Sequence, residues 1–209
     1  MKIKDKSLYL VTSQEFSGNK DSFYIAKEAI EAGVDILQMR EKTKTRPELV
    51  SLGKKLCCLC RDRKVLFIVN DDPFLAKEVD ANGVHLGQED IKKHSIQEVR
   101  NILGKEKIIG LSTHSVEQFL EANEKDIDYI AFGPIFQTKT KNYCIGEGDV
   151  ERVLTLSEKP IVFIGGINLD NIGRLVKKGA KHIAVIRAIT EAEDITVQVH
   201  EFKKRINDV

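Results

Sequence analysis

Polar and charged side chains follow five consecutive apolar segments of the chain, each short enough to form one β-strand. The groups are Gln38-Met39-Arg40-Glu41-Lys42, Asn70-Asp71-Asp72, His85-Leu86-Gly87-Gln88-Glu89-Asp90, Ser112-Thr113-His114 and Thr138-Lys139-Thr140-Lys141. They combine carboxylates with cations, a mixture that suits a metal ion bound to a phosphate ester. Any one group is compatible with a solvated loop or a helix cap, whereas five in succession favour an active site.

The carboxylates Asp71 and Asp90 are the expected metal ligands. They are 19 positions apart in the sequence, but each follows a strand, and adjacent strands would bring them close together. Mg²⁺ typically takes one or two protein carboxylates and completes its octahedron with phosphate and water. Two unpaired carboxylates would repel each other without a cation. Asp72 precedes Pro73 and is expected to cap a helix.

Three cations are expected to bind a polyphosphate beside this metal. Arg40 can make bidentate contacts, and Lys42 and Lys141 act as point charges. Surface salt bridges are the alternative for each cation taken singly. A second phosphate site is indicated further along the chain, where Gly165-Gly166-Ile167 precedes a helix and Ile186-Arg187-Ala188 ends the last strand.

Short apolar segments and amphipathic helical stretches alternate along the whole sequence and predict eight strand-helix units. The expected strands are Leu8 to Thr12, Asp35 to Arg40, Val65 to Asn70, Gly83 to Leu86, Lys107 to Ser112, Tyr129 to Gly133, Pro160 to Gly165 and His182 to Arg187. Helical connections favour parallel strands. We therefore predict an α/β fold, a single (β/α)8 TIM barrel over residues 1–209. An open doubly wound sheet is the alternative, but no G-x-G-x-x-G follows the first strand.

Glycines recur where a helix is expected to end and a strand to begin. Gly33 and Gly179 each precede an apolar strand, and Gly83 begins one. Glycine suits the left-handed conformation past a helix end, so this role is predicted for all three.

Composition excludes several classes of partner. The 33 basic and 32 acidic residues leave a net charge of +1, which gives no broad basic surface for nucleic acid or anionic lipid. No apolar segment has the length of a signal peptide core or a membrane span, so a cytoplasmic protein without membrane partners is expected. Cys57, Cys58 and Cys60 fall within a helical pattern, Cys144 stands alone, and no function is assigned to any of them.

The ordered motifs resemble those of the thiamine phosphate synthase family across nearly the whole chain. They are Q-x-R-E-K at residues 38–42, N-D-D at 70–72, H-x-G-Q-E-D at 85–90, G-P-I-F-x-T-x-T-K at 133–141 and G-G-I at 165–167. The resemblance implies that 4-amino-2-methyl-5-hydroxymethylpyrimidine pyrophosphate is joined to 4-methyl-5-hydroxyethylthiazole phosphate, yielding thiamine phosphate and pyrophosphate.

The same resemblance assigns roles to individual residues. It implies that Asp71 and Asp90 hold Mg²⁺, and that the pyrophosphate is bound by Arg40, Lys42, Asn70 and Lys141. Gln38 and Ser112 would contact the pyrimidine. The thiazole phosphate would be bound by Thr138, Thr140, Gly166 and the backbone of Ile186 and Arg187. Arg187 departs from the serine often found in the family, and both a backbone contact and a guanidinium contact remain open.

The implied reaction needs no general base, because the attacking thiazole nitrogen carries no proton. His85 and His114 accordingly lack a matched serine or cysteine nucleophile. Catalysis would come from stabilising the departing pyrophosphate, and we expect a dissociative step through a pyrimidine carbocation. The segment from Gln137 to Glu147 would act as a lid that carries Lys141 inward.

Two other functions stay open at this point. One is a thiazole tautomerase-like barrel, which would transfer a proton without Mg²⁺. The other is a non-catalytic sensor of thiamine precursors on the same barrel. Asp71, Asp90 and Lys141 favour the synthase, since neither alternative needs a pyrophosphate site. The sequence predicts no oligomeric state.

Overall fold

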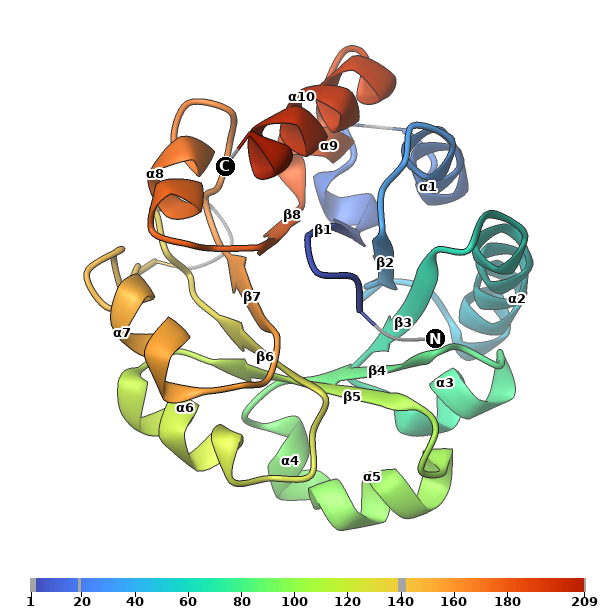
Figure 1. Ribbon diagram of the computed structural model, residues 1–209. Coiled ribbons are helices and arrows are strands. Elements are labelled where there is room, and N and C mark those ends of the chain that lie inside the picture. The colour runs from blue at the N-terminus through green and yellow to red at the C-terminus, as the bar shows by residue number, and fades with distance from the viewer. Residues whose placement is uncertain (1–2, 19, 139–141, 209) are drawn as a thin grey trace.

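Eight parallel strands close into a barrel at the centre of the molecule, and helices surround it (Figure 1). The computed structural model describes residues 3–18, 20–138 and 142–208. Each strand pairs with the next along the chain, and the last pairs with the first, with Leu8 opposite Ile183. The expected (β/α)8 TIM barrel is confirmed, and the open doubly wound alternative is wrong.

The observed strands differ from the expected ones by at most two residues at either end. They are β1 (Ser7–Thr12), β2 (Ile36–Met39), β3 (Leu66–Asn70), β4 (Gly83–Leu86), β5 (Ile108–Thr113), β6 (Tyr129–Phe132), β7 (Ile161–Ile164) and β8 (His182–Val185). The largest difference is at β8, which was expected to continue to Arg187. Arg187 is instead the first residue of a short helix.

Helices occupy the connections between the strands. They are η1 (Gln14–Phe16), α1 (Ser22–Glu31), α2 (Arg46–Arg63), α3 (Pro73–Glu78), α4 (Asp90–Lys93), α5 (Ile96–Leu103), α6 (Val116–Asn123), α7 (Val150–Leu156), α8 (Ile172–Lys177), α9 (Arg187–Thr190) and α10 (Ile195–Asn207). No helix in these described ranges is both long and apolar enough to cross a membrane.

Residue alternation along the strands divides the apolar side chains into two clusters. Outward-facing residues such as Leu8 and Leu10 pack under the helices in the larger cluster. Inward-facing residues such as Tyr9, Val11 and Tyr129 fill the barrel interior in the smaller one. This two-sided burial explains why the parallel strands are continuously apolar.

Local sequence signals set the helix ends. Ser95 and Glu98 form a capping box at the start of α5, with Ser95 Oγ accepting from Glu98 N at 3.2 Å and Glu98 accepting from Ser95 N at 2.7 Å. Asp72 caps α3 by accepting from Leu75 N at 2.8 Å, as expected. Cys57 and Cys60 lie on the buried side of α2 and are free thiols.

The expected role of the three glycines is confirmed at two positions and wrong at the third. Gly33 and Gly179 have φ of 101° and 94°, the left-handed conformation that glycine adopts freely. Gly83 instead lies within β4, where an added Cβ would stand 2.0 Å from the carbonyl oxygen of Ile108. Glycine is needed there because β4 and β5 approach closely, and Asp80 supplies the left-handed turn with φ of 56°.

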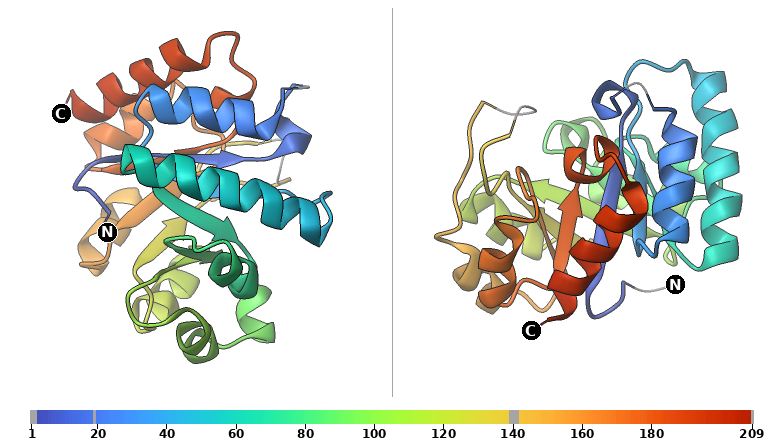
Figure 2. Two further views of the ribbon diagram at one scale, coloured as in Figure 1. Left: turned by 90° about the vertical axis from the view of Figure 1, so that its right-hand side faces the viewer. Right: turned by 90° about the horizontal axis from the view of Figure 1, so that it is seen from above.

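Asp35 connects three parts of the chain at the end of the barrel opposite the strands' carboxyl ends. Its side chain is 2% exposed and accepts from Leu8 N at 2.9 Å, Lys4 Nζ at 2.8 Å and Lys203 Nζ at 2.5 Å. Burial raises the pKa of this carboxyl, and the hydrogen bonds from Lys203, Lys4 and Leu8 more than compensate, so the pKa lies below its ordinary value. Figure 2 shows that β1 begins and α10 ends at this same end of the barrel.

We expect Asp35→Ala to lower the free energy of unfolding by about 3 kcal/mol, because it leaves the half-buried ammonium of Lys203 and the buried amide of Leu8 without their acceptor. Urea unfolding followed by circular dichroism measures the change. Asp62→Ala is the control, since Asp62 is exposed on α2. Equal stability of the two variants would show that the Asp35 contacts contribute nothing.

Candidate active site

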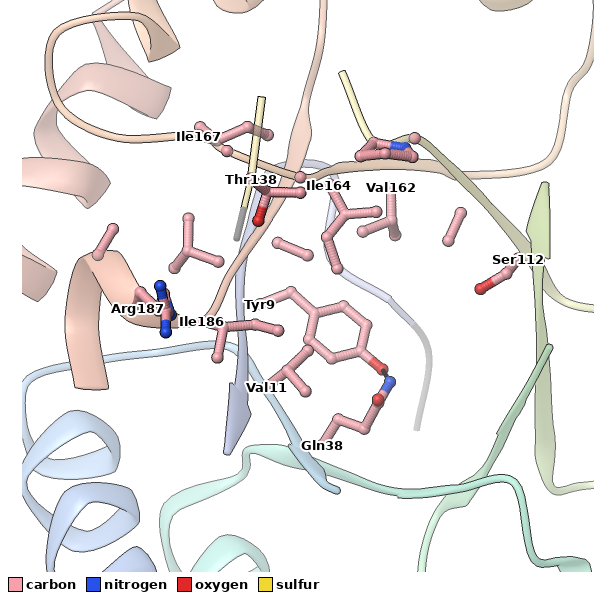
Figure 3. Close-up of a pocket in the computed structure, with 18 of the residues that line it drawn as sticks. Tyr9, Val11, Gln38, Ser112, Thr138, Val162, Ile164, Ile167, Ile186 and Arg187 are labelled. Carbon is pink, nitrogen blue, oxygen red and sulfur yellow. Dashed lines mark hydrogen bonds between the residues drawn. The ribbon is translucent and has the colours of Figure 1, made fainter. Parts of the chain in front are cut away.

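A cavity of about 530 Å³ opens at the carboxyl ends of the strands, where barrel enzymes build their active sites. Inward apolar residues of the barrel, including Val11, Val162 and Ile164, line part of the cavity together with polar residues such as Gln38 and Ser112 (Figure 3). Eight of the residues predicted to bind substrate line it, namely Gln38, Arg40, Asn70, Ser112, Thr138, Gly166, Ile186 and Arg187.

The two-residue alternation of the strands explains why several of these side chains face the cavity. Ile36, Ile68 and Ile108 belong to the cluster that fills the barrel interior. Two residues further toward the carboxyl end of each strand stand Gln38 on β2 and Asn70 on β3. On β5 the same row passes through Gly110 and reaches Ser112. The polar strand ends therefore continue the same inward-facing rows as the apolar interior.

Arg40 is held at the end of β2 with part of its charge unpaired. Its backbone N donates to Thr12 O at 3.2 Å. Neighbouring Glu41 is buried and accepts from Ser22 Oγ at 2.6 Å and Gln14 N at 2.9 Å, which attaches the β1–α1 connection to this strand end. Within the described residues, Arg40 Nη1 is buried without a hydrogen-bond partner. A buried unpaired guanidinium nitrogen facing a cavity is suited to an anion.

Asp71 and Asp90 come together beside the cavity, within hydrogen-bonding reach of each other. Asp71 follows β3 with φ of 66°, and its backbone N donates to His85 O at 2.8 Å on β4. Asp90 Oδ2 accepts from Gly87 N at 2.9 Å. Gly87 leaves room for this contact, because an added Cβ would lie 3.1 Å from Asp90 Oδ2.

The proximity of the two carboxyl groups changes their acid–base behaviour. Burial, and then the adjacent Asp90, raise the pKa of Asp71 to about 6, while Lys42 and Arg40 oppose this shift. The donor set is thus two carboxylates held against their mutual repulsion, which fits a hard divalent cation. Across the described parts of the chain, no cluster of three or more His, Cys, Asp or Glu side chains could hold a metal.

The opposite side of β1 carries a second unpaired guanidinium nitrogen. Arg187 begins α9 and stacks over the Phe16 ring, with the guanidinium carbon 4.7 Å from the ring centroid. Its Nε lies 3.4 Å from Glu191 Oε1. The geometry of that ion pair makes no hydrogen bond, and among the described residues Nε is buried without a partner. Arg187 therefore faces the cavity as a cation oriented by a ring and a carboxylate.

Gly165 and Gly166 form the wall next to Arg187. Their φ angles are 103° and 64°. An added Cβ on Gly165 would lie 2.3 Å from Pro134 Cβ, and one on Gly166 would lie 2.3 Å from Gln137 O. Only glycines let this turn pack against the segment after β6, which leads to Thr138.

The pocket floor contains hydrogen bonds that the sequence patterns did not reveal. Gln38 Nε2 donates to Tyr9 Oη, and His85 Nε2 contacts Ser112 Oγ at 2.8 Å. Gln88 Nε2 donates to Ser112 O at 2.6 Å. Burial lowers the pKa of His85 to about 4, so the ring is neutral at physiological pH. A tyrosine at an inward position of an otherwise apolar strand is the only sequence signal that could have pointed to this arrangement.

The expectation that His85 has no serine partner is wrong, because its Nε2 lies 2.8 Å from Ser112 Oγ. The roles expected of other residues stay predictions. Lys42, Asp71 and Asp90 lie outside the cavity lining, although Lys42 acts electrostatically on Asp71. His114 is held by Gly133 O, 2.6 Å from its Nδ1. Thr140 and Lys141, and with them the expected lid movement, lie outside the described residues.

We expect Asp71→Asn to stabilise the magnesium-free protein at pH 8, and about half as much at pH 5. The pKa of Asp71 is 3.8 in the unfolded chain and about 6 in the folded protein. Ionisation of this group therefore lowers the stability of the folded protein as the pH rises from 3.8 through about 6. The gain in the free energy of unfolding should stay below about 1 kcal/mol, because solvent screens the repulsion between carboxylates at the exposed edge of the cavity. Urea unfolding in chelator at both pH values measures it. Asp72→Asn is the control and should not stabilise the protein at either pH, since Asp72 caps α3. Equal urea unfolding curves for wild type and Asp71→Asn at pH 8 would contradict a repulsion between Asp71 and Asp90.

Comparison with known proteins gives one consistent family. The family model described as thiamine monophosphate synthase matches residues 8–189. The thiamine-phosphate synthase of Persephonella marina is 37% identical over 205 residues and 97% of each chain. That of Dictyoglomus thermophilum is 42% identical over 195 residues, covering 92% of this chain and 86% of the relative.

Solved structures agree with the sequence comparison. Thiamine phosphate pyrophosphorylase from Pyrococcus furiosus has a TM-score of 0.88 at 35% identity, covering 98% of this chain and 96% of that one. A geranylgeranylglyceryl phosphate synthase from Thermoplasma acidophilum, at 16% identity and TM-score 0.68, shares the fold alone. With its barrel, its paired carboxylates and these relatives, the chain belongs to the thiamine monophosphate synthase family.

Proposed function

We propose that the chain is a transferase that joins 4-amino-2-methyl-5-hydroxymethylpyrimidine pyrophosphate to 4-methyl-5-hydroxyethylthiazole phosphate, releasing pyrophosphate and thiamine phosphate. One observation carries the proposal beyond family membership. Two buried guanidinium nitrogens, Arg40 Nη1 and Arg187 Nε, lack partners in the described structure and flank one cavity. Two separate anions are what the two substrates would bring.

The pyrophosphate is assigned to the side of the cavity formed by β2 and β3. Arg40 and Asn70 line this side, with Lys42 and the carboxylate pair at its edge. Asp71 and Asp90 would hold Mg²⁺, whose positive charge would stabilise the departing pyrophosphate. Lys141 is assigned to the same pyrophosphate from its place in the motif after β6.

The pyrimidine is assigned to the cavity floor between Gln38 and Ser112. These residues lie on β2 and β5 and are the polar groups next to the apolar wall formed by Val11, Ala131 and Val162. A flat heterocycle buried among apolar side chains needs few but well-placed polar partners. Both residues are held by hydrogen bonds from the barrel interior.

The thiazole phosphate is assigned to the side formed by β7 and β8. Gly166 and the backbone of Ile186 and Arg187 would supply N–H donors, with Thr138 and Thr140 completing the site. Arg187 adds a guanidinium that is already oriented by Phe16 and Glu191. The proposal assigns that guanidinium to the phosphate as well as the backbone.

The bond change follows from this placement. The C–O bond between the pyrimidine methylene and pyrophosphate breaks, and its electron pair leaves with the pyrophosphate. The exocyclic amino group delocalises the positive charge left on the pyrimidine. The thiazole nitrogen lone pair then forms the new C–N bond at the methylene. Arg40, Lys42 and Lys141 stabilise the leaving group, and the cavity holds the two heterocycles in contact.

No side chain needs to accept a proton in this scheme. His85 is committed to Ser112 and Tyr129, and His114 to the Gly133 carbonyl. The carboxylate pair of Asp71 and Asp90 disfavours a tautomerase, which would bind no magnesium pyrophosphate. A non-catalytic sensor has no use for the carboxylate pair, and product formation by the purified protein would exclude it.

The direct test is to mix purified protein with both phosphorylated precursors, with magnesium or with chelator, and to measure thiamine phosphate by oxidation to its fluorescent product. We expect product only with the metal. Asp71→Asn and Lys141→Ala should each lower kcat by the equivalent of about 2–4 kcal/mol while leaving the fold intact. Wild-type turnover in both variants, or full activity in chelator, would refute the assignment.

The Arg187 assignment predicts a substrate-specific defect. Arg187→Ser should raise KM for the thiazole phosphate about tenfold and leave KM for the pyrimidine pyrophosphate nearly unchanged, because it removes one charge-assisted hydrogen bond. Steady-state kinetics with each substrate varied in turn measures this. Glu191→Gln keeps the side-chain size and is the matched comparison. If Arg187→Ser leaves KM for the thiazole phosphate unchanged, the guanidinium does not bind the phosphate, and the contact at residue 187 is made by the backbone alone.

A further inference from the structure

An uninterrupted series of hydrogen bonds crosses the barrel interior from Gln38 to Ser112. Gln38 Nε2 lies 2.7 Å from Tyr9 Oη, and Tyr9 Oη lies 2.9 Å from Tyr129 Oη. Tyr129 Oη lies 2.8 Å from His85 Nδ1, and His85 Nε2 lies 2.8 Å from Ser112 Oγ. We call this series the interior chain; Figure 3 shows its first contact, between Gln38 and Tyr9.

The interior chain has one direction of donation. Gln38 Nε2 donates to Tyr9, so the single proton of Tyr9 Oη is available for Tyr129. Tyr129 then donates to His85 Nδ1, which must be the unprotonated ring nitrogen. His85 Nε2 therefore carries the ring proton and donates to Ser112 Oγ. Ser112 keeps its own hydroxyl proton for the cavity, and Gln38 Oε1 remains an acceptor.

The fold makes room for this arrangement at one residue. Gly110 on β5 lies between His85 on β4 and Tyr129 on β6 in the strand register. An added Cβ at Gly110 would stand 2.0 Å from Tyr129 Cζ. Without that side chain, the His85 and Tyr129 rings stack across β5, with centroids 5.5 Å apart and planes at 20°.

Burial keeps the interior chain from exchanging its partners with water. Tyr9 and Tyr129 are each 1% exposed, and His85 is 8% exposed. Among the described residues, the two tyrosine hydroxyls have no hydrogen-bond partner outside the interior chain. An unpaired hydroxyl would destabilise such an interior. Each group is therefore held as the hydrogen-bond donor or acceptor that its neighbours require.

We propose that Tyr9, Tyr129 and His85 are positioning residues that fix the orientation of the Gln38 amide, with Oε1 as the acceptor for the substrate, and fix Ser112 as a donor, and so select a 4-aminopyrimidine over a 4-oxopyrimidine. The inference rests on the proposed function, because it takes the pyrimidine to lie between Gln38 and Ser112. None of the three residues needs to exchange a proton with the substrate.

The selection follows from the edges of the two heterocycles. A 4-aminopyrimidine presents an N–H donor beside an acceptor ring nitrogen. A 4-oxopyrimidine presents a carbonyl acceptor beside a ring N–H donor, the reverse pattern. An acceptor at Gln38 and a donor at Ser112 match the first and leave polar groups unpaired with the second. Severing the interior chain frees Gln38 and Ser112 to reverse their roles.

Nuclear magnetic resonance tests the direction of donation without any substrate. Long-range proton–nitrogen spectra of uniformly ¹⁵N-labelled protein at pH 7 identify the protonated ring nitrogen of His85, assigned through its ring-to-backbone correlations. We expect a neutral ring protonated at Nε2. A ring protonated at Nδ1, or at both nitrogens, would overturn the proposal.

Selectivity is tested by inhibition with two non-reacting probes, the 4-amino and 4-oxo forms of the 2-methyl-5-hydroxymethylpyrimidine monophosphate. Wild type should bind the amino form at least tenfold more tightly. Tyr129→Phe removes the central hydroxyl while keeping the ring, and we expect it to reduce this ratio about tenfold. Tyr9→Phe should have the same effect. Thr113→Val is the matched control, because it removes a buried hydroxyl beside Ser112 that donates to Ala131 O and lies outside the interior chain.

The outcomes separate this inference from the proposed function. If wild type forms no thiamine phosphate, the proposed function fails whatever the spectra show. If wild type is active and Tyr129→Phe keeps the full amino-to-oxo ratio, the inference alone fails. A loss of selectivity shared equally by Thr113→Val would show a general effect of destabilisation and would also overturn it.

Discussion

Closure of an eight-stranded parallel sheet is the constraint on which the site depends. Because β8 pairs with β1, all eight carboxyl ends meet around one opening, and residues distant in sequence become neighbours. Asp71 and Asp90 approach each other only because β3 and β4 are adjacent in this ring. The two-residue alternation then decides which side chain at each strand end faces the cavity.

The site contains groups that do not stabilise the folded chain. Two carboxyl groups are held close enough to raise the pKa of Asp71 to about 6, and two guanidinium nitrogens are buried without partners in the described structure. At the opposite end of the barrel, by contrast, three donors satisfy the buried carboxylate of Asp35. Under the proposed function, a cation and two phosphates would neutralise the groups at the site.

The barrel interior below the site is mostly apolar, and the interior chain crosses it. The polar atoms of the interior chain satisfy one another from β2 to β5, so a buried polar series coexists with Val11, Ile68 and Val162 around it. Gly110 shows how the packing permits this, because a missing side chain on one strand lets rings from both neighbours meet. The same feature connects the two polar groups proposed to contact the pyrimidine.

The sequence alone predicted the parts that depend on local patterns. The eight strands, the barrel, the cap at Asp72 and the meeting of Asp71 with Asp90 all follow from periodicity and from the order of strands. Periodicity could not give the structural role of Glu41, the close approach at Gly83 or the start of α9 at Arg187. Only the tertiary structure decided these and the contacts among Tyr9, Tyr129 and His85, because register and packing between strands bring together side chains that no local pattern relates.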